Sequence, residues 1–293
     1  MKNIMTRQFS ILGDCGKIYQ FMSDIYERDW RNGVPAPFFE YAYSSFAYWM
    51  DISYSYKNRI WEDKGEIVAF CFYENPVTDI YFSLKPGYEE LAPQMLAYAD
   101  GHMPQKDGER QMILFGGQTA LMDAAKELGY CQVYERFDMQ FDFGDVLDYP
   151  LPEGFHFVKP EEYDVDKIGK CCWKGFDNEE TEGAWNHQHE QDGYQRQVAP
   201  HATTQLDVII ADGEGEYACY AGMWWTPQNK LAYMEPLCTI PEYRGRGLAA
   251  AALSEMYRKT KKLGATHMSG GDNGFYRKIG YNNVVKWAYW KKG

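Results

Sequence analysis

Residues 231–263 place a strand, a glycine-containing turn and a helix in immediate succession. Residues 231–239 are mostly apolar and predict a buried strand, and residues 248–263 carry apolar side chains at helical spacing. Between them, Gly245 and Gly247 let the main chain approach a ligand closely. Backbone N–H groups in the first turn of a helix have no intrahelical partner and bind phosphate oxygens well. The junction therefore predicts a phosphate-binding turn at the start of a helix.

The segments that follow this junction are also well specified. Three lysines lie in the last predicted helical turn, where cations complement the helix dipole. Gly264 follows and is expected to form the C-terminal cap. Next come a short predicted strand at 266–269, a Gly-Gly turn and the segment 273–281, which reads Asn-Gly-Phe-Tyr-Arg-Lys-Ile-Gly-Tyr.

Two short motifs carry a family resemblance. Arg244, Gly247 and Ala249 fit the pattern (Gln or Arg)-x-x-Gly-x-(Gly or Ala), the acetyl-CoA signature of the GCN5-related N-acetyltransferase (GNAT) superfamily, which this chain resembles. Residues 273–281 resemble the superfamily's second signature, a Tyr shortly before Gly-Phe or Gly-Tyr. The phosphate loops of P-loop and dinucleotide-binding proteins have different spacing. The resemblance implies an α/β fold of the α+β type, a mostly antiparallel twisted sheet flanked by helices.

The chain also shows a weak internal repeat with a period of about 150 residues. Four segments match in order: 65–70 with 215–220, 80–88 with 233–243, 115–117 with 269–271, and 128–130 with 279–281. We therefore expect two tandem GNAT-like domains, residues 1–150 and 151–293. The linker is expected at residues 148–154, which are rich in proline and end in glycine.

The two copies differ where the chemistry is expected. After Tyr88 the first copy has Glu89-Glu90-Leu91 in place of the glycine turn, and two carboxylates repel a diphosphate. Where the second copy has Phe275-Tyr276, the first carries residues 122–125 on a longer predicted helix. We expect the first domain to be degenerate, without a CoA motif, and the second to be the catalytic acetyltransferase domain.

The resemblance also implies where acetyl-CoA, the co-substrate, would bind. The pantetheine would pair with the backbone of one strand, and the pyrophosphate would lie on N–H groups of the turn. The residues concerned are Leu237, Cys238, Thr239, Arg244, Gly245, Arg246, Gly247, Leu248 and Ala249. Asn273 is a further cofactor-binding candidate, although capping of the next helix would also explain it.

The resemblance places two candidate catalytic residues in this domain. Tyr276 matches the family's general acid, which protonates the departing thiolate, and the alternative is a core aromatic. Glu235 lies in the strand that would border the thioester and is the candidate base, although pairing with a helix lysine would also explain it. The carboxylate of Gly293 is another candidate base.

An acidic and aromatic stretch suits a cationic amine as acceptor. It contains Trp173, Phe176, Asp177, Glu179, Glu180, Glu182 and Trp185. A solvated acidic loop is the alternative. The expected reaction transfers an acetyl group to a primary amine, first of a small polycationic or aminoglycoside-like molecule and second of a peptide or protein. A non-catalytic CoA-binding sensor and a ligase that uses aminoacyl-tRNA are the other classes.

Composition narrows the partners and the location. The net charge is −12, and residues 1–154 alone carry −11, so nucleic acid is not an expected partner. No apolar run is long enough to span a membrane, and residues 1–10 lack the apolar core of a secretory signal, so we expect a cytoplasmic protein. The sequence leaves open whether the chain forms a homodimer.

No metal site is predicted. The seven cysteines are scattered, without a Cys-x-x-Cys pair or a disulfide pattern. His187 and His189, with Glu190 and Asp192, could hold zinc in principle, but no further ligand follows at metal-site spacing.

Overall fold

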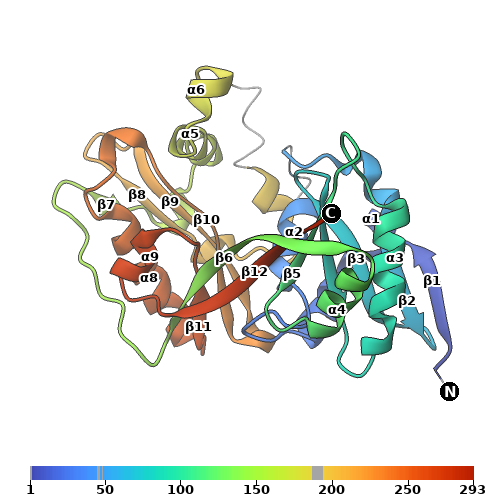
Figure 1. The fold of residues 1–293 in the computed structure, drawn as a ribbon. Coiled ribbons are helices and arrows are strands. Elements are labelled where there is room, and N and C mark those ends of the chain that lie inside the picture. The colour runs from blue at the N-terminus through green and yellow to red at the C-terminus, as the bar shows by residue number, and fades with distance from the viewer. Residues whose placement is uncertain (1, 45–46, 48, 187–193) are drawn as a thin grey trace. The chain divides into compact units, whose positions relative to one another are not determined.

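The computed structural model describes residues 2–44, 47, 49–186 and 194–293 (Figure 1). The chain divides into two compact units. The first comprises Met1–Asp138 and Val284–Gly293, and the second comprises Met139–Asn283.

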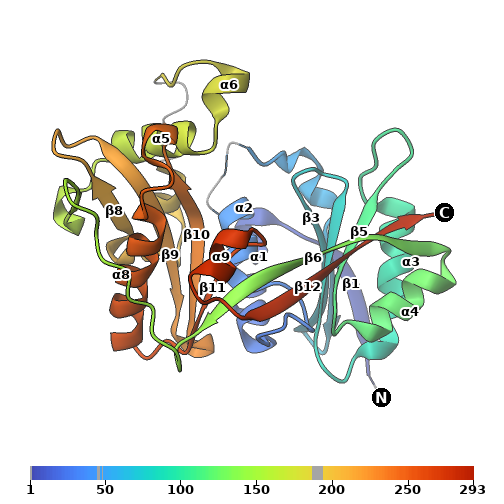
Figure 2. The ribbon, with the colours of Figure 1, turned by 60° about the vertical axis from the view of Figure 1, so that its left-hand side comes forward.

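In the first unit, helices cover both faces of a mixed sheet. The strands, in sheet order, are β1 (Ile4–Gln8), β2 (Arg59–Asp63), β3 (Glu66–Glu74), β4 (Asp79–Leu84), β5 (Gln111–Phe115), β12 (Asn283–Lys292) and β6 (Tyr130–Asp142). The pair β4–β5 is parallel, and the pairs β1–β2, β2–β3, β3–β4 and β5–β12 are antiparallel. Figure 2 shows α1 (Ile11–Asp24) and α2 (Ala36–Tyr43) on one side of this sheet, with α3 (Ala92–His102) and α4 (Thr119–Glu127) on the other.

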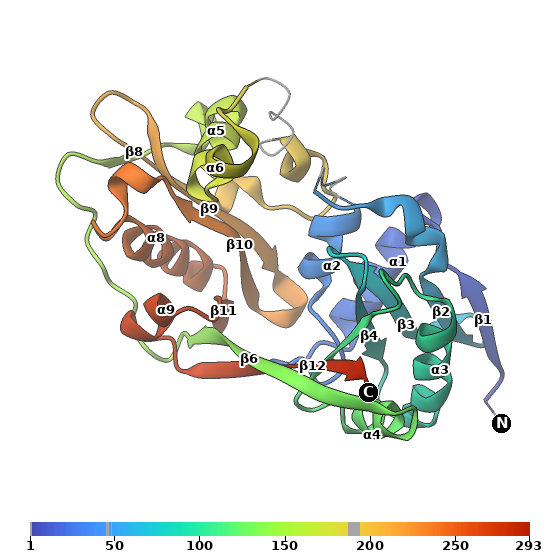
Figure 3. The same ribbon diagram turned by 45° about the horizontal axis from the view of Figure 1, so that its top comes forward.

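The second unit repeats this plan with a sheet in the order β6-β11-β10-β9-β8-β7. Its further strands are β7 (His156–Phe157), β8 (Val208–Ala211), β9 (Tyr217–Thr226), β10 (Leu231–Thr239) and β11 (His267–Ser269). Its α-helices among the described residues are α5 (Val165–Gly175), α6 (Asn178–Glu182), α8 (Leu248–Lys262) and α9 (Gly274–Lys278). In Figure 3, α5 and α8 lie on opposite faces of this sheet.

Each face of the second sheet has its own apolar core. The α8 face buries Phe141, Met223, Leu253 and Met256, among others. The α5 face buries a smaller cluster that includes Ile168, Cys171, Tyr220 and Cys238. β9 and β10 are nearly continuous apolar runs, and because successive side chains of a strand point to opposite faces, they supply both cores.

The compact units divide the chain at other points than the predicted domains 1–150 and 151–293. One boundary falls inside β6, because Phe143 and Leu147 join the core under α8, and the Tyr149 N–H donates to Ser254 Oγ at 2.9 Å. The other precedes Val284, because β12 pairs with β5 and buries Trp287 in the first unit. The expected linker segment therefore packs on the second unit, and the last strand belongs to the first.

The strand, turn and helix predicted at residues 231–263 are present. β10 has the predicted bounds, and α8 begins at the predicted residue. Gly264 has φ +92° just past the helix, and the N–H groups of Gly264 and Ala265 donate to Lys261 O and Thr260 O at 3.0 and 3.1 Å. This C-terminal cap is the one that the glycine predicted.

Among the described residues, no helix has the length and apolar character needed to cross a bilayer.

Candidate active site

The turn between β10 and α8 presents a row of backbone donors. Gly245 and Gly247 have φ values of +75° and +92°, which side chains with a Cβ rarely adopt. Gly247 precedes the first residue of α8, Leu248. None of the hydrogen bonds found among the described residues uses a backbone N–H of residues 245–250 as its donor. These groups lie at the positive end of a 15-residue helix, and the turn can therefore bind an anion.

Beside this turn, the outer half of β10 has an open edge. β10 pairs with β9 along most of its length, but its register with β11 covers only Leu231 and Ala232. The Ile240 N–H donates to Ala218 O at 3.1 Å on the β9 side. Because hydrogen-bonding groups alternate in direction along a strand, the backbone groups of Leu237 and Thr239 point away from β9. An extended amide-containing ligand can pair with that edge.

The turn, the open edge and α9 line one cavity of about 720 Å³. The described residues that line it are Tyr149, Leu237, Cys238, Thr239, Tyr243, Arg244, Gly245, Gly247, Leu248, Ala249, Ala250, Asn273, Phe275, Tyr276, Lys278 and Ile279. All of them belong to the second unit. Of the thirteen residues predicted to bind cofactor or act in catalysis, ten line this cavity. The three that do not are Glu235, Arg246 and Gly293.

Tyr276 is both a core residue and a cavity residue. It lies on the five-residue helix α9, is 6% exposed, and packs its ring 5.1 Å from that of Tyr281. Two glycines make room for this ring. A Cβ added to Gly270 would lie 2.7 Å from Tyr276 Cδ1, and one added to Gly271 would lie 3.0 Å from Tyr276 Cε2. Both interpretations of Tyr276 are thus compatible with its place.

Asn273 caps α9. Its Oδ1 accepts a hydrogen bond from the Phe275 N–H at 3.0 Å, and its backbone is extended, as an N-cap requires. Because Asn273 also lines the cavity, its Nδ2 can still donate to a ligand.

The other three candidates do not line the cavity. The Arg246 guanidinium lies 5.1 Å from the centre of the Tyr243 ring. Glu235 is half-buried, and its carbonyl accepts a hydrogen bond from Trp224 Nε1 at 3.1 Å. Gly293 belongs to the first unit, where its N–H donates to Gly129 O at 3.1 Å.

Six lining residues were not predicted: Tyr149, Tyr243, Ala250, Phe275, Lys278 and Ile279. All but Tyr149 adjoin the two motifs, so proximity in sequence could have suggested them. Tyr149 precedes β10 by about eighty residues, and no local pattern indicates that it reaches this cavity. Tyr243 donates to Asp212 Oδ2 at 2.6 Å, which lowers the pKa of Asp212 and raises the pKa of Tyr243.

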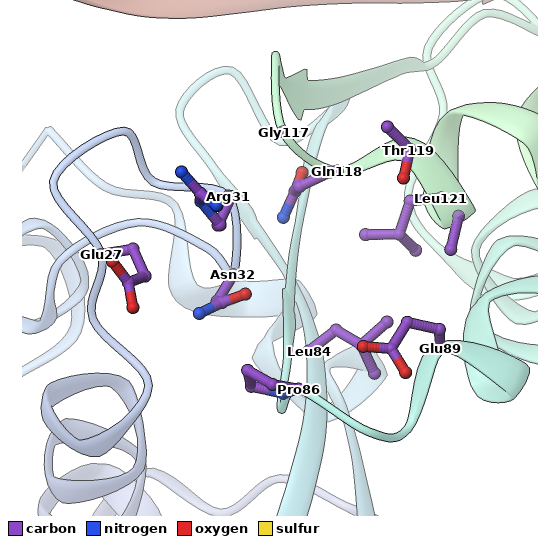
Figure 4. Close-up of a pocket in the computed structure, with 11 residues that line it drawn as sticks. Glu27, Arg31, Asn32, Leu84, Pro86, Glu89, Gly117, Gln118, Thr119 and Leu121 are labelled. Atoms are coloured by element: carbon purple, nitrogen blue, oxygen red, sulfur yellow. The ribbon is translucent and has the colours of Figure 1, made fainter.

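The first unit has a cavity at the corresponding step of its topology, after β4 and at the start of α4 (Figure 4). It measures about 380 Å³, and Glu27, Arg31 and Asn32 border it from the loop after α1. Here several of the backbone donors are used or absent. The Gly87 N–H donates to the Glu89 carboxylate at 2.9 Å, and a proline occupies the first turn of α3. This turn therefore lacks the row of donors found at residues 245–250.

The acidic and aromatic stretch divides between core and surface. Trp173 is fully buried, and its Nε1 donates to Gly183 O at 2.9 Å, which is a packing role. Phe176 is 48% exposed, and the glutamates of α6 are exposed. His187, His189, Glu190 and Asp192 lie outside the described residues. In the part of the chain that the structure describes, no group of three or more His, Cys, Asp or Glu side chains could hold a metal.

Residues 165–281 match the sequence model of the acetyltransferase (GNAT) family. No curated protein matches the chain. The fold is similar to a tandem GNAT protein from the clavulanic acid biosynthesis pathway, with 12% identity, a TM-score of 0.61 and coverage of 99% of this chain and 98% of that one.

Two further solved structures share the fold. A GCN5-related N-acetyltransferase from Sphaerobacter thermophilus has 14% identity and a TM-score of 0.58, over 99% of this chain and 95% of that one. A GNAT-family acetyltransferase from Colwellia psychrerythraea has 10% identity and a TM-score of 0.59, over 99% of both chains. At these identities the likeness concerns the fold alone.

Proposed function

We propose that this chain, whose residues 165–281 match the GNAT family model and whose fold is similar to that of a tandem GNAT protein, is an acyltransferase that transfers an acetyl group from acetyl-CoA to a primary amine. The acceptor in this proposal is a small cationic molecule, and the second unit carries the chemistry.

One observation carries the proposal. A row of unused backbone N–H groups at the start of α8, the open edge of β10 and Tyr276 all border a single cavity. The first feature suits a diphosphate, the second an amide-containing arm, and the third a departing thiolate. CoA contains these three groups in this order along its length, which supports the assignment of the coenzyme to this cavity.

The reaction requires two proton movements. The amine nitrogen, as free base, attacks the thioester carbonyl carbon, and the resulting tetrahedral oxyanion collapses with cleavage of the C–S bond. We assign Tyr276 as the acid that protonates the departing thiolate. A phenol of reference pKa about 10 can protonate a thiolate, whose conjugate acid has a pKa of about 8.5, once that charge develops.

Glu235 does not line the cavity but lies on β10 two residues before Leu237, which does, and we assign it as the group that takes the proton from the amine through water. An amine of pKa about 10 is mostly protonated near neutral pH, so a carboxylate can first bind the cation and then accept its proton. The acidic surface of α6 would raise the local concentration of such an acceptor. We also propose a cytoplasmic location, which the seven free thiols favour, since disulfides are rare in that compartment.

The test combines binding with turnover. We expect calorimetry to show one CoA site per chain, and we expect thiol release from acetyl-CoA to be stimulated by one class in a panel of polyamines, aminoglycosides and peptides. Substitution of Gly247 by Trp forces a bulky side chain into a position with φ +92° beside the N–H row, so CoA binding should be lost.

Gly87→Trp is the matched control, because Gly87 has φ +86° in the corresponding turn of the first unit and has open space around it. CoA affinity should be unchanged in this variant. Binding without turnover on any amine would instead support a sensor, and stimulation by peptides alone would support a peptide or protein acceptor. Absence of CoA binding in the wild type would refute the proposal.

A further inference from the structure

The side chain of Arg244 joins the cofactor turn to the junction between α5 and α6. Its Nε donates to Thr239 O at 3.1 Å. Its Nη2 donates both to Gly175 O, at 2.9 Å, and to Asp177 Oδ1, at 2.8 Å. A single guanidinium therefore contacts the end of β10, the end of α5 and the residue that precedes α6.

Two other contacts hold the same segments together. Lys174 Nζ, on the last turn of α5, lies 3.5 Å from Glu242 Oε1 in the short helical turn after β10. A Cβ added to Gly175 would lie 2.7 Å from the Cβ of Cys238. The end of α5 thus packs directly on the strand that borders the cavity, and the Arg244 contact is part of a continuous junction.

The geometry of this junction favours a cation. The carbonyl of Gly175 is at the C-terminal end of α5, where carbonyl groups lack an intrahelical donor and positive charge is favoured. Asp177 has φ +61°, a left-handed conformation in which the chain turns sharply from α5 into α6. Arg244 satisfies the carbonyl and pairs with the carboxylate, so it sets the direction in which α6 leaves α5.

We propose that Arg244 is a positioning residue, which holds the start of the acidic α6 segment against the cofactor turn, and that it is not a phosphate ligand. The proposal rests on the proposed function insofar as α6 is where a cationic acceptor would be attracted. It leaves the diphosphate to the backbone N–H groups of residues 245–250.

The forked shape of arginine distinguishes this role from that of a point charge. Arg244 and Asp177 are 44% and 43% exposed, and one exposed ion pair contributes little by itself. Arg244 instead makes three directed hydrogen bonds to two segments, which lysine cannot reproduce, although it keeps the charge. Arg244→Lys therefore removes these directed hydrogen bonds while preserving any electrostatic contribution to phosphate binding.

The first measurement is amide hydrogen exchange of residues 175–182 in the ligand-free full chain. Arg244→Lys and Asp177→Asn should each accelerate exchange there by about fivefold, because both weaken the same local structure. Asparagine tolerates the left-handed conformation, so Asp177→Asn removes charge without backbone strain. The double variant should exchange no faster than the faster single variant, since the two side chains act as one pair.

Arg258→Lys is the control for exchange. Arg258 is a similarly exposed arginine that bonds to Glu255 on α8 and to Asp148 in a loop that packs beside α8. Its substitution should leave the exchange rates of residues 175–182 unchanged.

The second measurement is CoA affinity by calorimetry, which should stay within about threefold of wild type in Arg244→Lys and Asp177→Asn. The KM for the best amine of the panel should rise about fivefold in both variants, with kcat changed less.

Unchanged exchange at residues 175–182 in both variants would overturn the proposal. So would CoA binding about tenfold weaker in Arg244→Gln with unchanged exchange, because that result places Arg244 on the phosphates. If the wild type does not bind CoA, the proposed function fails, whereas the exchange measurement still decides the role of Arg244.

Discussion

At the scale of single residues, the acid role proposed for Tyr276 depends on its hydroxyl, whereas its position depends on the packing of its ring. Its ring is buried against Tyr281 and Phe275, which fixes the direction in which the phenol points, and the residue lines the cavity. Removal of the hydroxyl alone leaves this packing intact and isolates the chemical role.

We predict that Tyr276→Phe lowers kcat about a hundredfold, the typical contribution of one general acid, and leaves CoA affinity within about twofold. Thiol release and calorimetry measure the two quantities. Tyr257→Phe is the control, because Tyr257 is a buried tyrosine of α8 whose hydroxyl donates to Asp145 O and does not line the cavity. An undiminished rate in Tyr276→Phe would exclude the acid role.

A second residue, Asp14, makes stability depend on pH. Burial would raise the pKa of Asp14, but hydrogen bonds from the Arg7 guanidinium and the Ser10 N–H outweigh it, so the pKa is lowered. A lowered pKa in the folded state stabilises the fold above the unfolded pKa of about 3.9, and this stabilisation is lost as pH falls through the folded value.

Asp14→Asn should therefore reduce the free energy of unfolding by about 1–2 kcal/mol at pH 7, the usual effect of losing charged hydrogen bonds. The difference from wild type should shrink as pH falls below about 4. Urea unfolding at a series of pH values measures it. A difference that is the same at pH 7 and pH 3 would contradict this account.

At the scale of elements, three glycines allow backbone segments to approach within the second unit. Gly175 admits Cys238, Gly222 lies against the carbonyl of Glu235, and Gly270 lies against the rings of Tyr276 and Tyr281. In each case, an added Cβ would come within 3 Å of a heavy atom. These contacts fix how α5, β9 and α9 meet the strands that border the cavity.

Gly270→Ala should therefore reduce stability by about 1–3 kcal/mol, the usual cost of overpacking, and should lower kcat because the ring of Tyr276 must shift. Thermal unfolding and thiol release measure the two effects. Gly274→Ala is the control, since Gly274 begins α9, has open space around it and should tolerate or favour alanine. Equal stability of the two variants would refute the packing argument.

At the scale of the whole molecule, the last strand of the chain completes the first unit. Trp287 of β12 is 2% exposed, and its ring lies 5.0 Å from Phe115 and 5.6 Å from Trp30. The Arg136 guanidinium lies 4.0 Å from the centre of the same ring. Folding of the first unit therefore requires residues at both ends of the chain, whereas the cavity residues all lie between them.

Trp287→Ala should cost about 3–5 kcal/mol, typical of truncating a large buried aromatic side chain, and should destabilise the first unit. CoA affinity should stay within about twofold of wild type at a temperature where the second unit is folded, because no cavity residue belongs to the first unit. Urea denaturation monitored by tryptophan fluorescence measures the stability, and calorimetry measures the CoA affinity. Val284→Ala, at an exposed position of the same strand, should change neither. Parallel loss of stability and CoA binding would show that the second unit cannot fold without the first.

Local chemistry explains which features were predictable. The strand at 231–239, the helix from 248 and the cap at Gly264 depend on side-chain periodicity and backbone conformation within a few consecutive residues. The tandem arrangement was predictable because four segments repeat in order, and the fold comparisons agree with it. The allocation of the last strand was not, since a repeat in sequence carries no information about which unit a strand joins.

The sequence by itself determined the turn, the elements on either side of it and the order of the two copies, because each depends on neighbouring residues. Only the tertiary structure decided that Tyr149 lines the same cavity as this turn, and that Arg244, which also lines the cavity, bonds to Asp177. It also decided that β12 completes the first unit. These facts depend on packing between residues far apart in the chain. That packing is determined by how well whole helices and strands fit against one another.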